Sequence, residues 1–260
     1  MHETLEDFAL NNGLRDVSPA LKLALGLCCM LLSVSSPGPV APLLIACSLT
    51  LVVLFSAGIP AGFYLKLLTI PASFAAMSIL VILFLTGGGE VLVSVSLPGL
   101  PLTVTTGGAN LAVLLLARIS GGMCALFFIS LTTPATEIFS LMRRCGLPAA
   151  FIDLSMLIYR YIFVFISEAE MIYRSQVMRL GYGSLREAIR SFGMLAGALF
   201  LRTWESGERL MVAMDARCYD GRFGALDETP PVSAPALVAV ALYLAALLGI
   251  ACLTMQTTIF

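Results

Sequence analysis

The amino-acid sequence predicts an all-α integral membrane protein with about five transmembrane helices, a cytoplasmic module of amphipathic helices and a short external β-hairpin-like loop. Of the 260 residues, 59% are hydrophobic and 12% are charged, whereas soluble domains carry about 25% charged residues. Several apolar runs reach the roughly 20 residues that a helix needs to cross the hydrocarbon core of a bilayer. Most of the arginines lie between residues 143 and 222, outside these runs. This composition excludes a soluble enzyme.

The N-terminal half of the chain contains four apolar runs that proline and glycine residues separate. Residues 1–18 are polar and acidic, and they lack the basic start of a secretory signal peptide. Thr4 and Asp7 can cap a short surface helix there, and Pro71 can kink the third apolar run. We interpret the four runs as transmembrane helices over residues 20–35, 40–57, 60–86 and 109–131.

Residues 87–107 have a different pattern from the runs on either side. Apolar and polar side chains alternate from Val91 to Leu97, and β-forming threonines lie between residues 103 and 106. Pro98-Gly99 lies between the two stretches, as a turn requires. This pattern predicts a short β-hairpin at the membrane surface.

Arg118 is a charged residue inside the fourth predicted span. A charge at that depth is costly, so it either has a functional role, snorkels to the surface or pairs within the bundle. The sequence alone favours neither alternative for Arg118: a structural role in packing or pairing, or a role in transport.

The C-terminal half begins with helices outside the predicted spans. Thr132-Thr133-Pro134 starts a short helix, and Gly146-Leu147-Pro148 breaks it. The apolar residues 151–166 are almost long enough for a further span. Asp153 and Arg160 within them favour a helix that lies at the membrane interface instead.

Residues 185–214 have the periodicity of an amphipathic helix, with Leu185, Ile189, Phe192, Leu195, Ala196 and Leu199 on one face. Glu205 and Arg209 form an i,i+4 pair on the other face. Proline-rich residues 228–235 are expected to form a linker, and residues 236–253 a final span. The sequence therefore predicts three parts: the N-terminal segment with four spans, the coupling helices, and the linker with the last span, over residues 1–131, 132–228 and 229–260.

Several function classes lack the residues that they need. The chain has two lysines, Lys22 and Lys66, and neither lies in a phosphate-binding loop, so the chain is not expected to hydrolyse ATP. The single histidine, His2, leaves little basis for histidine-dependent catalysis or a histidine metal site. None of the seven cysteines forms a C-x-x-C pair. A net charge of −1 does not support nucleic-acid binding. We predict no catalytic, cofactor or metal site in this chain.

The distribution of basic residues predicts the orientation in the membrane. Residues 143–222 hold 11 of the 15 lysines and arginines, so the positive-inside tendency places this segment in the cytoplasm. Counting back through four spans places the N-terminus in the cytoplasm too, and the C-terminus is then external. Three pieces would be external, and none of them contains lysine or arginine: residues 36–39, 87–107 and 254–260.

The second half of the chain contains a set of short motifs in a fixed order: Thr133-Pro134 with Glu137, Gly146-Leu147-Pro148, Ser175-Gln176-x-x-Arg179, Ala213-Met214-x-Ala216-Arg217-x-Tyr219 and Tyr219-Asp220-Gly221-Arg222. Together these motifs resemble those of the transmembrane T component of energy-coupling factor (ECF) transporters. The motifs of the cobalt-transport CbiQ branch are the most similar. The arginine triplets of that family are usually close to Ala-Arg-Gly or Ala-Arg-Ser. Here they are Met178-Arg179-Leu180 and Ala216-Arg217-Cys218.

The resemblance implies a non-catalytic subunit of an ATP-driven importer in a bacterial inner membrane. Two CbiO-like ATPases would grip the coupling helices through Arg179 and Arg217, with the flanking residues Met178, Leu180, Ala216 and Cys218. A CbiM-like membrane subunit would bind cobalt, the ATPases would bind ATP, and a small CbiN-like subunit is a further candidate partner.

Other interpretations remain open at the level of the sequence. An ECF T component for nickel or a vitamin, a membrane scaffold or sensor, and a secondary transporter with its own substrate path are the alternatives. The two arginines also have a purely structural interpretation, because a cation stabilises the C-terminal end of a helix dipole.

Overall fold

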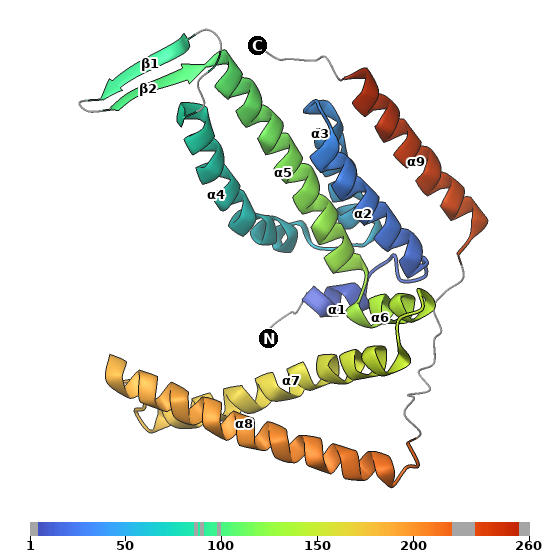
Figure 1. The fold of residues 1–260 in the computed structure, drawn as a ribbon, viewed down its shortest axis with the longest axis vertical. Coiled ribbons are helices and arrows are strands. Elements are labelled where there is room, and N and C mark those ends of the chain that lie inside the picture. Colours follow the sequence, from blue (N-terminus) through green and yellow to red (C-terminus); the bar gives the residue numbers. More distant parts are fainter. Residues whose placement is uncertain (1–4, 86–87, 89–90, 98–99, 220–231, 255–260) are drawn as a thin grey trace. The chain divides into compact units, whose positions relative to one another are not determined.

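The computed structural model describes residues 5–85, 88, 91–97, 100–219 and 232–254. Helices dominate these residues, as the sequence predicts (Figure 1). The elements are α1 (Leu5–Leu10), α2 (Pro19–Ser35), α3 (Val40–Leu51), the π-helical η1 (Val52–Ser56), α4 (Ala61–Leu85), β1 (Val91–Leu97), β2 (Leu100–Thr105), α5 (Thr106–Thr132), α6 (Ala135–Arg144), α7 (Ala149–Met178), α8 (Leu185–Asp215) and α9 (Ala234–Leu253).

The chain divides into two compact units. Unit 1 comprises the residues before position 139 and those after position 228, and unit 2 comprises residues 139–228. The boundary falls inside α6, so the first turn of that helix belongs to unit 1 and its last turn to unit 2. The two units are described separately below.

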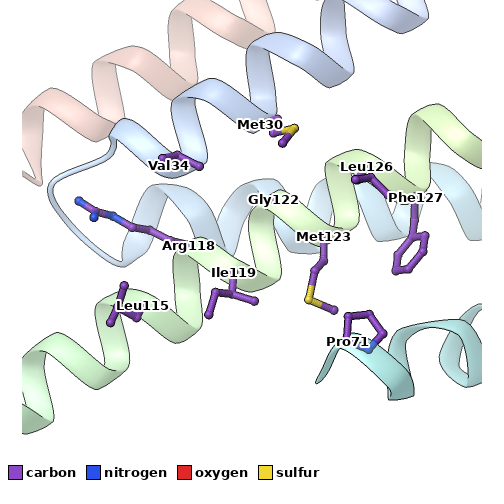
Figure 2. A pocket seen from close by; sticks show the side chains of 10 residues that line it. All are labelled: Met30, Val34, Pro71, Leu115, Arg118, Ile119, Gly122, Met123, Leu126 and Phe127. Atoms are coloured by element: carbon purple, nitrogen blue, oxygen red, sulfur yellow. The ribbon is translucent and has the colours of Figure 1, made fainter. Parts of the chain in front are cut away.

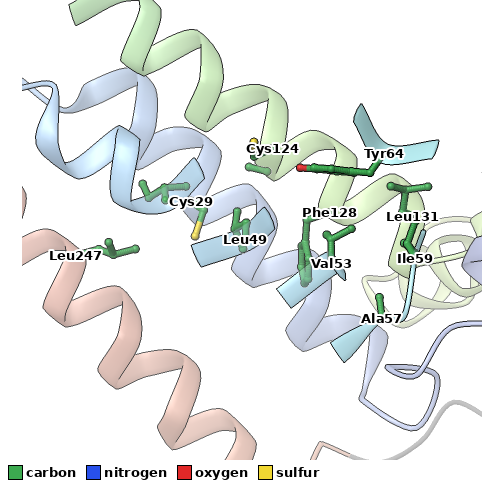
Figure 3. Packing of buried hydrophobic residues seen from close by; sticks show 12 residues of the cluster. Cys29, Leu49, Val53, Ala57, Ile59, Tyr64, Cys124, Phe128, Leu131 and Leu247 are labelled. Carbon is green, nitrogen blue, oxygen red and sulfur yellow. The ribbon is translucent and has the colours of Figure 1, made fainter. Parts of the chain in front are cut away.

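Helix α5 is the centre of unit 1 and contacts α2, α3 and α4. Small residues allow its neighbours to approach closely, as is usual between membrane helices. A Cβ atom on Gly121 would lie 2.8 Å from the carbonyl oxygen of Pro42. The buried core forms around these contacts and contains Cys29, Ile45, Leu49, Val53, Ala57, Ile59, Tyr64, Cys124, Ala125, Phe128, Leu131 and Leu247 (Figure 3).

Within the described residues, four helices are long and apolar enough to cross a membrane: α4, α5, α7 and α9. Helices α2 and α3 with η1 are apolar but shorter. This confirms an all-α, multi-pass membrane protein. Length and composition also admit α7 as a span, so the interfacial position expected for residues 151–166 stays a prediction. The π-helical turn of η1 was not predicted, since the sequence indicated a regular helix to Ala57.

The predicted hairpin is present between α4 and α5. Strands β1 and β2 pair antiparallel, with Val95 opposite Leu102 and a register shift between Val91 and Val93. The turn residues 98–99 lie outside the described residues. The external location of the hairpin stays a prediction.

The short N-terminal helix expected from the sequence is α1. Its proposed cap, Thr4, lies outside the described residues, as do residues 228–231 of the predicted linker 228–235. Helices α8 and α9 begin within two residues of the predicted positions, and the Glu205–Arg209 pair forms with a nitrogen–oxygen distance of 3.7 Å.

Candidate functional site

Unit 2 contains the predicted coupling residues, and its main feature is a helical hairpin of α7 and α8. The connection is short and contains two glycines, Gly181 and Gly183. Ser184 then caps α8, because its side chain accepts a hydrogen bond from the backbone N–H of Glu187 at 3.3 Å. An ion pair between Glu168 and Arg202 joins the two helices. A short connection of this kind produces antiparallel neighbours.

Hydrogen bonds between side chains and backbone hold the turn between α7 and α8 in one conformation. The Gln176 side-chain nitrogen donates to the Ser191 carbonyl at 3.0 Å, and the Tyr182 hydroxyl donates to the Gln176 side-chain oxygen at 2.9 Å. The Ser191 hydroxyl donates to the Gly181 carbonyl at 2.7 Å. A Cβ on Gly181 would lie 2.6 Å from the Ser191 hydroxyl oxygen, so this close approach requires glycine. Gln176 of the Ser-Gln motif therefore has a structural role.

The end of α7 places Arg179 in a Schellman motif, a common C-terminal cap of helices. The N–H of Gly181 donates to the carbonyl of Gln176 at 2.9 Å, and the N–H of Leu180 donates to that of Val177 at 3.0 Å. Leu180 has the left-handed conformation that the motif requires, with φ of 58°.

The end of α8 has the same motif around Arg217. The N–H of Tyr219 donates to the carbonyl of Met214 at 3.1 Å, and the N–H of Cys218 donates to that of Asp215 at 3.0 Å. Cys218 has φ of 55°. In both helices an arginine therefore comes directly before a left-handed residue that is not glycine. The two triplets that the sequence singled out are two copies of one local structure.

All six predicted contact residues are exposed. Met178 and Leu180 have exposed fractions of 85% and 81%. Across the part of the chain that the structure describes, neither Arg179 nor Arg217 has a hydrogen-bonded or ion-pair partner for its guanidinium group. The structure does not bring the two arginines together, because α8, with 31 residues, lies between them. At ~1.5 Å per residue that helix is about 45 Å long.

Two ion pairs that sequence reasoning missed lie at the two ends of α6. In unit 2, Arg143 Nη2 lies 2.6 Å from Asp153 Oδ1, and the Asp153 side chain is only 3% exposed. In the sequence Asp153 favours an interfacial position, but in the structure its side chain is buried and its charge pairs with the partly exposed Arg143. Arg143 and Asp153 lie on either side of the predicted helix break at Gly146. Opposite charges this close to a tight turn are the sequence signal from which the ion pair could have been predicted.

The ion pair in unit 1 involves the first turn of α6. Lys22 Nζ donates to the carbonyl of Thr132 at 3.0 Å and lies 3.6 Å from Glu137 Oε2. Lys22 is 3% exposed. Asn12 Nδ2 approaches the same Thr132 carbonyl at 3.4 Å. Lys22 therefore satisfies a carbonyl at the end of α5 and also contacts the start of α6.

An apolar groove of about 580 Å³ lies between α7 and α8. It is lined mainly by aliphatic side chains, and the tyrosines Tyr161 and Tyr219 also take part. The apolar face predicted for α8 is largely uncovered, since Leu185, Ile189 and Phe192 are all more than 60% exposed. Large exposed apolar surfaces mark sites that contact a partner or a membrane. In the described ranges, no cluster of three or more His, Cys, Asp or Glu side chains could hold a metal ion.

Comparisons with known proteins show the family to which the chain belongs. A protein of Methanocorpusculum labreanum, named as a fused cobalt transport protein CbiMQ, is 46% identical over 96% of this chain, which spans only 42% of that longer protein. The cobalt transport protein CbiQ of Rhodobacter capsulatus is 30% identical over 87% of this chain and 88% of its own length. An ECF transporter transmembrane protein EcfT of Bacillus selenitireducens is 28% identical over 68% of this chain and 70% of its own length. The family model of the cobalt transport protein CbiQ matches residues 11–226, and the chain therefore belongs to the CbiQ family.

Proposed function

We propose that this chain is the transmembrane coupling subunit of an ECF-type cobalt importer. It passes ATP-driven motion from two cytoplasmic ATPase subunits to a separate membrane subunit that binds cobalt. The observation that carries the proposal is the pair of identical helix ends, each presenting an exposed arginine, in a member of the CbiQ family. The chain itself binds neither ATP nor cobalt and catalyses no reaction.

Each arginine is suited to dock into an acidic groove of an ATPase. A guanidinium group is always charged and planar, and it can pair with a carboxylate through two parallel hydrogen bonds. The Schellman motif fixes the backbone on which each arginine stands. The two sites lie at opposite ends of α8, so one CbiO-like subunit can occupy each site. Met178 and Leu180 flank the first arginine, and Ala216 and Cys218 flank the second.

The apolar groove between α7 and α8 is the proposed contact for the substrate-binding membrane subunit. A CbiM-like partner would cover the apolar lining of this groove with an apolar surface of its own. The relative that is named as a fused CbiMQ supports this pairing, because both parts lie in one chain there. A small CbiN-like subunit is a further proposed partner. In the proposed orientation unit 2 and the N-terminus are cytoplasmic, and the C-terminus is external.

Charge reversal of the two arginines tests the docking model. Leaving a buried charge unpaired costs about 3–5 kcal/mol, which corresponds to a loss of affinity of more than about 100-fold. Arg179→Glu and Arg217→Glu should each abolish co-purification of the ATPase subunits and cobalt uptake by membrane vesicles. Parallel uptake of nickel and cobalt identifies the transported ion.

Arg186→Glu is the matched control, because Arg186 is exposed near the start of α8 and exposed pairs contribute about 1 kcal/mol or less. The docking model is wrong if all three variants retain the same assembly and uptake. In that case the two arginines only stabilise helix ends.

A further inference from the structure

Unit 1 contains a second apolar groove, which the proposed coupling function does not use. It has a volume of about 450 Å³ and lies among α2, α4 and α5. Met30 and Val34 of α2 and Pro71 of α4 face the groove from two sides, and successive turns of α5 form its floor (Figure 2). One charged residue, Arg118, stands among these apolar side chains.

The Arg118 side chain extends from α5 toward the turn that follows α2 (Figure 2). Its Nε and Nη2 atoms donate to the carbonyl oxygen of Ser36 at 3.1 and 2.7 Å. Among the residues that the structure describes, Arg118 has no carboxylate partner. A guanidinium group has five N–H donors, and a neutral carbonyl does not compensate its charge. The groove therefore offers a cation with unused donors.

The Arg118 guanidinium lies beside the end of α2, the level at which we place one head-group region of the bilayer. Arg118 lies ~20 Å along α5 from Thr132, at about 1.5 Å per residue. The hydrocarbon core is about 30 Å thick, and the side chain reaches farther, to the level where α2 ends. Long basic side chains extend in this way to bring their charge to the membrane interface. From Arg118 the groove continues along Ile119, Gly122, Met123 and Leu126 toward the other end of α5.

We propose that this groove binds one phospholipid. The phosphate pairs with the Arg118 guanidinium, and one acyl chain lies in the groove along α5. Arginine binds phosphate oxygens through paired N–H donors, and the apolar lining suits a hydrocarbon chain. The bound anion supplies the negative charge that the described part of the bundle lacks. Lipid binding is independent of the proposed coupling function, because no residue of unit 2 takes part.

The test uses the full chain, purified in detergent, and native mass spectrometry to count bound lipids. Dioleoylphosphatidylglycerol is the probe, and dioleoylglycerol, which has the same acyl chains without the phosphate, is its comparison. The unmodified chain should bind one phosphatidylglycerol in clear preference to the diacylglycerol. Arg118→Gln should weaken phosphatidylglycerol binding by about tenfold or more, because a charge-assisted interaction is lost. Arg118→Lys, which keeps the charge, should preserve most of the preference.

Gly122→Leu tests the acyl chain site separately. Gly122 lines the groove and a Cβ on it meets no atom within 4 Å, so a leucine there should project into the groove and weaken binding of both lipids. Gly249→Leu in α9 is the control, because a Cβ there also meets nothing within 4 Å. Circular dichroism and the elution volume identify any variant that does not fold. If one of Arg118→Gln and Gly122→Leu does not fold, the other variant decides.

Two results would overturn the proposal. One is binding of both lipids to Arg118→Gln and Gly122→Leu at the level of the unmodified chain. The other is unchanged lipid binding together with loss of a co-purifying membrane subunit in Arg118→Gln. That second result would assign the groove to a protein partner.

Discussion

At the scale of single residues, the left-handed positions of Leu180 and Cys218 are the most unusual feature of the site. Both have φ between 55° and 58°, a conformation that costs a residue with a side chain about 1–2 kcal/mol. Glycine is the usual residue at this position of a Schellman motif. Strain of this kind collects at functional sites. Leu180 and Cys218 therefore provide exposed side chains beside each arginine at the expense of stability.

Replacing either residue with glycine should therefore stabilise the chain. We expect Leu180→Gly and Cys218→Gly each to raise the free energy of unfolding by about 0.5–1 kcal/mol, after the larger backbone entropy of glycine is subtracted. Denaturation of the purified chain in detergent measures this change. Leu201→Gly, at an exposed position inside α8, should instead destabilise by about 0.5–1 kcal/mol. Equal destabilisation by all three variants would show that the backbone is not strained at Leu180 and Cys218.

At the scale of elements, α6 forms an ion pair at each of its two ends. Lys22 holds Glu137 in its first turn, within unit 1, and Asp153 holds Arg143 in its last turn, within unit 2. A helix of 10 residues is too short to be stable without such contacts. The first turn of α6 is therefore held to the end of α5, and its last turn is held to the start of α7.

Asp153→Asn should weaken the attachment of α6 to α7, because it breaks the ion pair between Arg143 and Asp153. The change removes the negative charge from an ion pair in which the Asp153 side chain is 3% exposed and the Arg143 side chain 23% exposed, so the loss of stability should approach about 3 kcal/mol. Denaturation in detergent and limited proteolysis near Gly146 measure the effect. Glu170→Gln breaks an exposed ion pair with Arg174 at 3.0 Å and should cost about 1 kcal/mol or less. Similar losses from the two variants would show that burial of the Arg143–Asp153 pair contributes nothing.

At the scale of the whole molecule, the proposed orientation depends on the placement of arginine along the chain. The described helices keep the predicted order. The number of spans before unit 2 therefore determines whether unit 2 and the N-terminus face the same side of the membrane. Helices α2 and α3 are short for a span. Two successive crossings return the chain to the side on which it began. The later elements therefore keep their sides if both helices cross or if neither does, and they change sides relative to the N-terminus only if one of the two crosses.

Cysteine labelling measures the orientation directly. In a variant without native cysteines, Val95→Cys should react with a membrane-impermeant maleimide added outside intact cells. Ser206→Cys should react only after the membrane is opened. External labelling at position 206 would invert the proposed topology. Disruption of the cells before labelling provides the control that both positions are accessible.

The sequence predicted those parts of the fold that depend on local patterns. Helix and strand positions follow from periodicity and from proline and glycine, which is why β1, β2 and α8 begin close to their expected positions. The contact between Lys22 and Thr132 joins residues 110 positions apart, and no local pattern indicates it. Neither groove could be predicted, because each is lined by residues of separate helices that come together only in the folded chain.

The candidate site was predicted in part. Motif resemblance singled out Arg179 and Arg217, and the structure shows that both stand at helix ends. Their shared backbone conformation was not predicted, because glycine normally signals a left-handed cap and neither triplet contains glycine. The π-helical turn of η1 had no signal in its apolar sequence either.

The uncovered apolar face of α8 has a consequence for biosynthesis. A newly made chain presents exposed side chains such as Phe192, Trp204 and Met211 before any other subunit reaches it. Exposed apolar surface of this kind attracts chaperones and promotes aggregation. In the proposed complex, a cell that makes this chain in excess of its partner subunits should therefore degrade the surplus. The amount of this chain in the membrane would then depend on the synthesis of those proposed partners.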